Sequence, residues 1–102
     1  DREGNWRVNK KVFAITPEVS NAIERRFYIM KSYESLLAVL GRSYAETATA
    51  DYRAMIEDYR QLYQKACIDF SCARDALFNR LIGTIPLRYS FNFDRLEVKC
   101  EW

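Results

Sequence analysis

The chain has 102 residues, 49% of them apolar and 15% aromatic, which is the size and composition of one folded domain rather than of a disordered tail. Sixteen Lys and Arg oppose fourteen Asp and Glu, and the signs are interleaved, so the net charge of +2 does not by itself indicate nucleic-acid binding. The longest apolar run of the helical region, 36–40, is far shorter than the roughly 20 residues of a membrane-spanning helix. We therefore predict one domain over 1–102 that does not enter a membrane.

Two segments precede the first predicted helix. Residues 1–7 are polar and could be flexible, and they are assigned no element. Residues 8–15 include Val12, Phe13 and Ile15, and β-branched and aromatic side chains of this kind favour strands. A short strand is predicted over 8–15.

The first helix follows directly. Thr16 is typical of a helix cap, and Pro17 suits the first helical position because the amide that it lacks would be unpaired there. Apolar residues then recur every three or four positions until Gly41, a residue type that commonly ends helices. The predicted helix spans 17–40, with Arg26 as a polar residue within the apolar stripe.

The second predicted helix spans 44–82. Ser43 and Glu46 form the pattern of a capping box at its start, and Gly83 supplies a stop at its end. The tripeptide Asp-Tyr-Arg occurs twice, seven residues apart, which is typical of helices that pack along one seam. The residues expected in that seam are Ala48, Tyr52, Met55, Tyr59, Leu62 and Ala66.

The final segment, 87–102, alternates apolar and polar residues, but the parity of the apolar positions changes across 92–95. Such a change marks a tight turn or a bulge, and we favour a β-hairpin over a single bulged strand. The last strand, 96–102, is terminal and apolar on one face. It could cover the core, or it could pair edge to edge with another chain.

Together these elements predict an α+β fold in the order β-α-α-β-β. At 1.5 Å per residue the two helices would be about 36 Å and about 58 Å long, so the first could not cover the second. The exposed third of the second helix would then need a small antiparallel sheet or a partner to bury it. The predicted architecture is an antiparallel two-helix hairpin with a long second helix, packed at one end on that sheet.

Catalytic and cofactor-binding motifs are scarce. The chain has no histidine, which removes the commonest nucleophilic and acid-base arrangements. Its three glycines form no phosphate-binding loop. We expect a protein that is not an enzyme and that has no cofactor, with an enzyme using a carboxylate or thiol site as the third-ranked alternative.

The three cysteines are Cys67, Cys72 and Cys100, and an odd number favours a reducing compartment, here taken as the cytoplasm. Cys67 and Cys72 are five residues apart in a predicted helix, so they lie on different faces and should not form a disulfide with each other. Their spacing matches no common zinc motif, and we expect no metal site.

The candidates for partner binding come from two arguments. The first is that tyrosine and arginine are over-represented among interface hot spots. The second is that the first helix is too short to cover the apolar end of the second helix. The structural alternative for the tyrosines is a packed seam with hydroxyls at its rim. The candidates are Tyr28, Tyr63, Arg25, Arg53, Arg60, Phe70, Leu77 and Phe78.

The leading functional hypothesis is a small non-catalytic interaction module, such as an adaptor, inhibitor or accessory subunit. It would act through a face of the helical hairpin or an edge strand, on another protein or on a second copy as a homo-oligomer. The alternative is a nucleic-acid-binding accessory protein with a basic and aromatic strip. The residues of that strip would be Trp6, Arg7, Lys10, Lys11, Arg25, Arg26 and Lys31.

Overall fold

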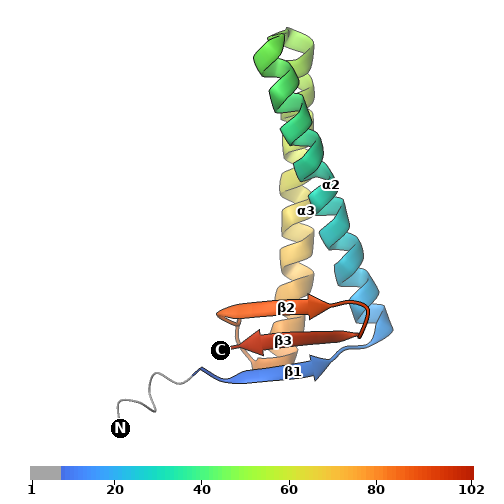
Figure 1. The fold of residues 1–102 in the computed structure, drawn as a ribbon, viewed down its shortest axis with the longest axis vertical. Coiled ribbons are helices and arrows are strands. Elements are labelled where there is room, and N and C mark those ends of the chain that lie inside the picture. The colour runs from blue at the N-terminus through green and yellow to red at the C-terminus, as the bar shows by residue number, and fades with distance from the viewer. Residues whose placement is uncertain (1–7) are drawn as a thin grey trace. The chain divides into compact units, whose positions relative to one another are not determined.

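The computed structural model describes residues 8–102 (Figure 1). Its elements in chain order are β1 (Lys10–Ala14), α2 (Pro17–Glu46), α3 (Ala50–Ile82), β2 (Arg88–Asn92) and β3 (Glu97–Glu101). The α+β class and the order β-α-α-β-β are thus confirmed. The chain divides into two compact units, one made of Ile23–Cys72 and the other of the sheet with the adjoining ends of both helices. The expectation for residues 1–7 lies outside the described residues.

The sheet is antiparallel throughout, in the order β1-β3-β2. Val98 pairs with Phe13 on one side and Phe91 on the other, and Cys100 pairs likewise with Lys11 and Tyr89. Directly paired residues point to the same face of a sheet, so these rows define the face that is buried. β1 is shorter than the predicted strand over 8–15, although the backbones of Asn9 and Trp102 extend its pairing with β3 by two hydrogen bonds of 2.6 and 2.9 Å.

The last strand is not an edge. β3 lies between β1 and β2 and is hydrogen-bonded on both sides, so it has no free edge for another chain. The prediction of edge-to-edge pairing through 96–102 is therefore wrong. The reason is topological, because the N-terminal segment 10–14 returns to pair with the C-terminal strand, and a single sequence gives no local signal for that pairing.

The predicted hairpin is confirmed, with β2 and β3 joined across residues 93–96. The turn lacks the usual Asn-Gly pair, and two other features close it. The side-chain oxygen of Asn92 accepts a hydrogen bond from the Arg95 amide at 3.1 Å, and Leu96 adopts a left-handed backbone with φ of 55°. The register pairs odd positions of β2 with even positions of β3, as in Phe91 with Val98, which accounts for the parity change seen in the sequence.

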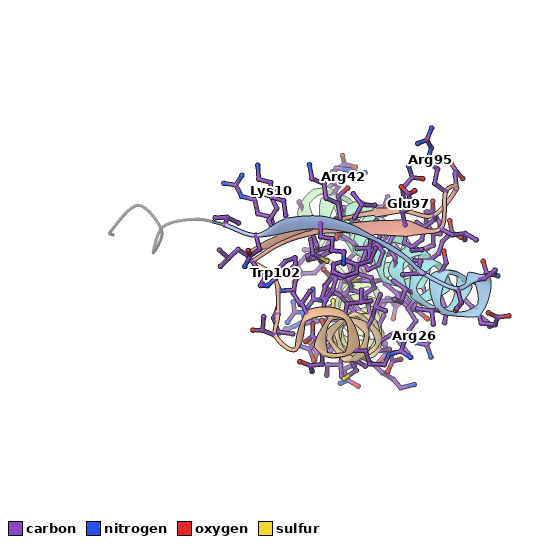
Figure 2. All side chains as sticks on the ribbon, turned by 90° about the horizontal axis from the view of Figure 1, so that it is seen from below. Lys10, Arg26, Arg42, Arg95, Glu97 and Trp102 are labelled. Carbon is purple, nitrogen blue, oxygen red and sulfur yellow. The ribbon has the colours of Figure 1, made fainter. Side chains whose placement is uncertain are left out.

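The sheet unit is built around Phe78, whose side chain is fully buried. Its ring packs against Tyr89 and Phe91 of β2 at centroid distances of 5.1 and 5.9 Å. On β1, Phe13 packs against Trp102 at 6.1 Å. Figure 2 shows that Lys10 and Trp102 extend from opposite faces of the sheet, as the strand alternation requires.

The helix ends differ from those predicted at the connection between the helices. α2 starts as predicted, with the Thr16 hydroxyl accepting the Val19 amide at 3.2 Å, but it continues through Gly41 to Glu46. A glycine stop needs a left-handed backbone, which Gly83 adopts at the end of α3 with φ of 74° and Gly41 does not. The capping box at Ser43 is therefore wrong.

The cap of α3 is Thr49, whose hydroxyl accepts the Tyr52 amide at 3.3 Å. The predicted helices over 17–40 and 44–82 become helices of 30 and 33 residues, about 45 Å and about 50 Å long. The predicted large difference in helix length is thus wrong. The predicted packing of the end of the second helix on a small antiparallel sheet is confirmed, since Phe78 of α3 contacts Tyr89 and Phe91 of β2. Among the described residues, no helix has a stretch long and apolar enough to cross a membrane.

Within residues 23–72, α2 and α3 run antiparallel (Figure 1). Two ring pairs connect them, Phe27 with Phe70 at 5.7 Å and Tyr33 with Tyr59 at 6.2 Å. The predicted seam is only partly right, because Ala48 lies outside α3 and is exposed, and Met55 and Leu62 are each 42% exposed. The buried or half-buried residues of α3 up to residue 72 are Tyr52, Ile56, Tyr59, Tyr63, Ala66, Cys67, Phe70 and Ser71.

Candidate functional site

The eight candidate residues do not gather at one site. Phe70, Leu77 and Phe78 are buried, so their side chains belong to the core of the chain and have little surface to offer a partner. The end of the second helix is covered by the sheet, which is one of the two predicted covers, since the rings of β2 pack on Phe78. The other five candidates are polar or aromatic residues of α2 and α3 with exposed or half-buried side chains.

The structure brings Arg53 and Arg60 together at one hollow between α2 and α3, near the turn that joins the helices. We call this hollow of about 970 Å³ the Tyr44 groove. Its lining residues are Gly41, Tyr44, Ala50, Arg53, Ala54, Ile56, Glu57 and Arg60.

The spacing of its residues explains why both helices contribute. Arg53, Ile56 and Arg60 are three and four positions apart, so they lie along one side of α3. Gly41 and Tyr44 are three apart and lie along the facing side of α2. A Cβ atom at Gly41 would have no atom within 4 Å, so the groove is open at this point.

The groove combines an apolar floor with a small positive charge. Ile56 is half-buried in it, whereas Arg53 and Arg60 are exposed. Arg60 lies 3.5 Å from the Glu57 carboxylate. Arg53 forms no ion pair with any other residue between 8 and 102, so its guanidinium can bind an added carboxylate.

No family model, curated protein or solved structure matches this chain. Only the geometry of the chain therefore indicates a site.

Tyr63 continues the same side of α3 beyond Arg60. The pKa of Tyr63 is raised above the ordinary 10.0, mainly by its hydrogen bond and charge interaction with Cys67, and further by the nearby Glu34 of α2. The phenol therefore stays protonated at neutral pH and can donate a hydrogen bond at the rim of the hairpin. Tyr63 is therefore the third candidate residue, after Arg53 and Arg60, on this side of α3.

Arg25 and Tyr28 lie elsewhere. Arg25 lines a separate hollow of about 220 Å³ together with Arg26, Ile29 and Asp69. Tyr28 is 57% exposed on α2 and its ring contacts the neighbouring Phe27 at 5.6 Å. Neither residue lines the Tyr44 groove.

The proposed basic strip is divided between the two units. Lys10 and Lys11 belong to β1, where consecutive residues point to opposite faces, and Lys10 lies 4.0 Å from Glu101. The ammonium of Lys11 lies over the Phe13 ring at 5.0 Å. Arg25, Arg26 and Lys31 lie in the helical unit, and Trp6 and Arg7 lie outside the described residues.

Sequence reasoning missed Gly41, Tyr44 and Ile56 as lining residues. With Gly41 as a helix stop, the sequence places Tyr44 in the second helix, where it cannot lie opposite Arg53. The signal that could have found them is their spacing along two continuous helices. Positions 41 and 44 are three apart on one helix, and positions 53, 56 and 60 are three and four apart on the other.

Proposed function

We propose that the chain is a non-catalytic protein-interaction module whose Tyr44 groove receives a segment of another protein. The observation that carries the proposal is the groove itself, a hollow lined by both helices in which two arginines surround an apolar floor. Interfaces are enriched in arginine and tyrosine around a desolvated apolar centre, and this groove offers the same combination.

The charge of the lining selects the kind of segment. Two arginines and one glutamate give the groove a net positive charge, and Glu57 already neutralises part of Arg60. A partner segment with an acidic residue next to an apolar one would pair its carboxylate with Arg53 and place its apolar side chain on Ile56. We therefore expect an acidic, partly apolar peptide segment as the ligand.

We also propose a cellular location for the chain. Cys67, Cys72 and Cys100 are all free thiols, and free thiols persist in reducing compartments. We place the activity in the cytoplasm.

The first test selects peptides from a random displayed library against the purified chain and measures the Kd of synthetic peptides by fluorescence anisotropy. We expect the selected peptides to carry Asp or Glu beside an apolar residue. In the double variant Arg53→Glu, Arg60→Glu the Kd should rise at least about tenfold, because two attractive charges become repulsive.

The matched control is Arg42→Glu, an equal change of charge at an exposed residue of α2 that does not line the groove. Its Kd should stay within about twofold of the wild-type value. The proposal would be abandoned if no acidic peptide were selected, or if the double variant and the control weakened binding equally.

A further inference from the structure

The opposite side of the helical hairpin carries exposed apolar residues that the Tyr44 groove does not use. Asp69 and Ile29 line one hollow, which places them on the same side of the hairpin. Leu62 lies seven residues before Asp69, and Met55 lies seven residues before Leu62. All three therefore lie in one row along α3. Ile29, Met55 and Leu62 are each 42% exposed.

On α2 the same side continues from Ile29 through Tyr33 to Leu36, at spacings of four and three. Tyr33 contacts Tyr59 of α3 across the hairpin at 6.2 Å, and all three of Tyr33, Leu36 and Tyr59 are half-buried. We call this surface the Leu62 face. Its residues are Ile29, Tyr33, Leu36, Met55, Tyr59 and Leu62.

Two charges on the margin of the Leu62 face are complementary to each other. Asp58 and Lys65 each lie three residues beyond an apolar member of the row, Met55 and Leu62 respectively. They are seven residues apart on one helix, about 10 Å along its axis, which is too far for them to pair within the chain. Within residues 8–102 neither of them forms an ion pair.

We propose that the Leu62 face binds a second copy of this chain, with the two α3 helices antiparallel about a two-fold axis. In such an isologous contact each Asp58 faces the Lys65 of the other copy, so the pair forms twice. The midpoint between positions 58 and 65 lies beside Leu62. The same axis therefore brings the two Leu62 side chains together at the centre of the interface.

The size of the face fits a weak specific dimer. The stretch of α2 from Ile29 to Ser43 is about 21 Å long, measured along the helix axis. Two helices packed about 10 Å apart present a surface about 20 Å wide. Each copy would then bury about 420 Å², so the total of about 840 Å² lies below the roughly 1,000 Å² of a stable interface, in the range of weak, transient contacts. We expect a Kd in roughly the micromolar range, with the Tyr44 groove left free on the other side.

The experiment measures molar mass by sedimentation equilibrium and light scattering over a concentration series up to about 500 µM, a range chosen to span a micromolar Kd. The wild-type chain should move from 12.1 kDa towards twice that value as its concentration rises. Leu62→Glu should stay monomeric. The control, Leu87→Glu, alters a residue that is 76% exposed and lies outside the helical unit, so it should dimerise as the wild type does.

Charge exchange tests the antiparallel arrangement. Asp58→Lys and Lys65→Asp should each raise the dimer Kd at least about tenfold, because each places like charges opposite one another twice. The double variant D58K/K65D restores opposite charges and should recover a Kd within about threefold of the wild-type value. Circular dichroism verifies that each variant keeps its helix content.

Three results would overturn the proposal. These are a wild-type chain that remains a monomer at the highest concentration, a dimer that Leu62→Glu leaves intact, and a double exchange that fails to recover the dimer. The peptide-binding test is independent, because a monomeric Leu62→Glu chain keeps the Tyr44 groove and should bind selected peptides with unchanged Kd.

Discussion

Among residues 8–102, Leu96 is the one residue other than glycine with a positive φ. Its φ of 55° lies in the left-handed region, which leucine rarely adopts because its Cβ approaches the carbonyl oxygen. Two contacts hold it there. The Leu96 carbonyl accepts the Ile15 amide at 2.9 Å, and the turn before it is closed by Asn92 and Arg95. A single residue thus joins the β2–β3 turn to the end of β1.

We predict that Leu96→Ile lowers the free energy of unfolding by about 1 kcal/mol, although the two side chains are isomers. Branching at Cβ increases crowding in a left-handed conformation, whereas the apolar volume is unchanged. Chemical denaturation followed by circular dichroism measures the change. Leu87→Ile is the control, since Leu87 is highly exposed and has no positive φ, and it should change stability by less than about 0.3 kcal/mol. Equal effects of the two substitutions would contradict the strain argument.

At the scale of elements, the start of α3 determines where the two helices are joined. The sequence offers two candidate caps, Ser43 and Thr49, and the structure uses Thr49. Ser43 lies inside α2 and is half-buried. The capping-box pattern was locally valid, but continuing α2 to Glu46 extends the helix by six residues, and Tyr44 can then line the groove.

We therefore predict that Thr49→Ala destabilises the chain by about 1 kcal/mol, the usual cost of losing a helix cap. Ser43→Ala should be neutral or stabilising by up to about 0.5 kcal/mol, since alanine favours the helix interior. Urea unfolding of both variants checks the pair. If Ser43→Ala lowered the free energy of unfolding more than Thr49→Ala, the helices would be joined at 41–43, as the sequence predicts.

At the scale of the whole molecule, the reactivity of the three cysteine thiols reports which parts of the fold are closed to solvent. Cys72 is exposed, Cys67 is half-buried, and Cys100 is buried in the centre of the sheet. Burial raises the pKa of the Cys100 thiol above its ordinary value of 9.0. Both the barrier to access and the smaller thiolate fraction lower its reactivity at pH 8.

We predict that Cys72 reacts first with a thiol reagent at pH 8 and that Cys100 reacts last, at a rate set by opening of the sheet. Mass spectrometry of the modified peptides over time measures the order. Urea at concentrations below the unfolding midpoint should increase the modification rate of Cys100 more than that of Cys72. If Cys100 reacted as fast as Cys72 without urea, the sheet would not be closed as described.

The sequence alone determined the elements whose signals are local. Strand alternation, the Thr16 cap, the Gly83 stop and the parity change near the hairpin turn are each encoded within a few residues, so the fold class and the element order followed from them. Arg53 and Arg60 were named because arginine is over-represented among interface hot spots, and both line the Tyr44 groove.

Only the tertiary structure decided the features that depend on contacts between distant residues. Whether Gly41 ends a helix, which strand is central and which apolar residues of α3 remain exposed are set by what packs against each element. α2 covers Ile56 and Tyr63 but leaves Met55 and Leu62 uncovered, although the heptad pattern includes the latter two. A periodic pattern gives the width of an apolar face, whereas the position of the neighbouring helix decides which part of that face is buried.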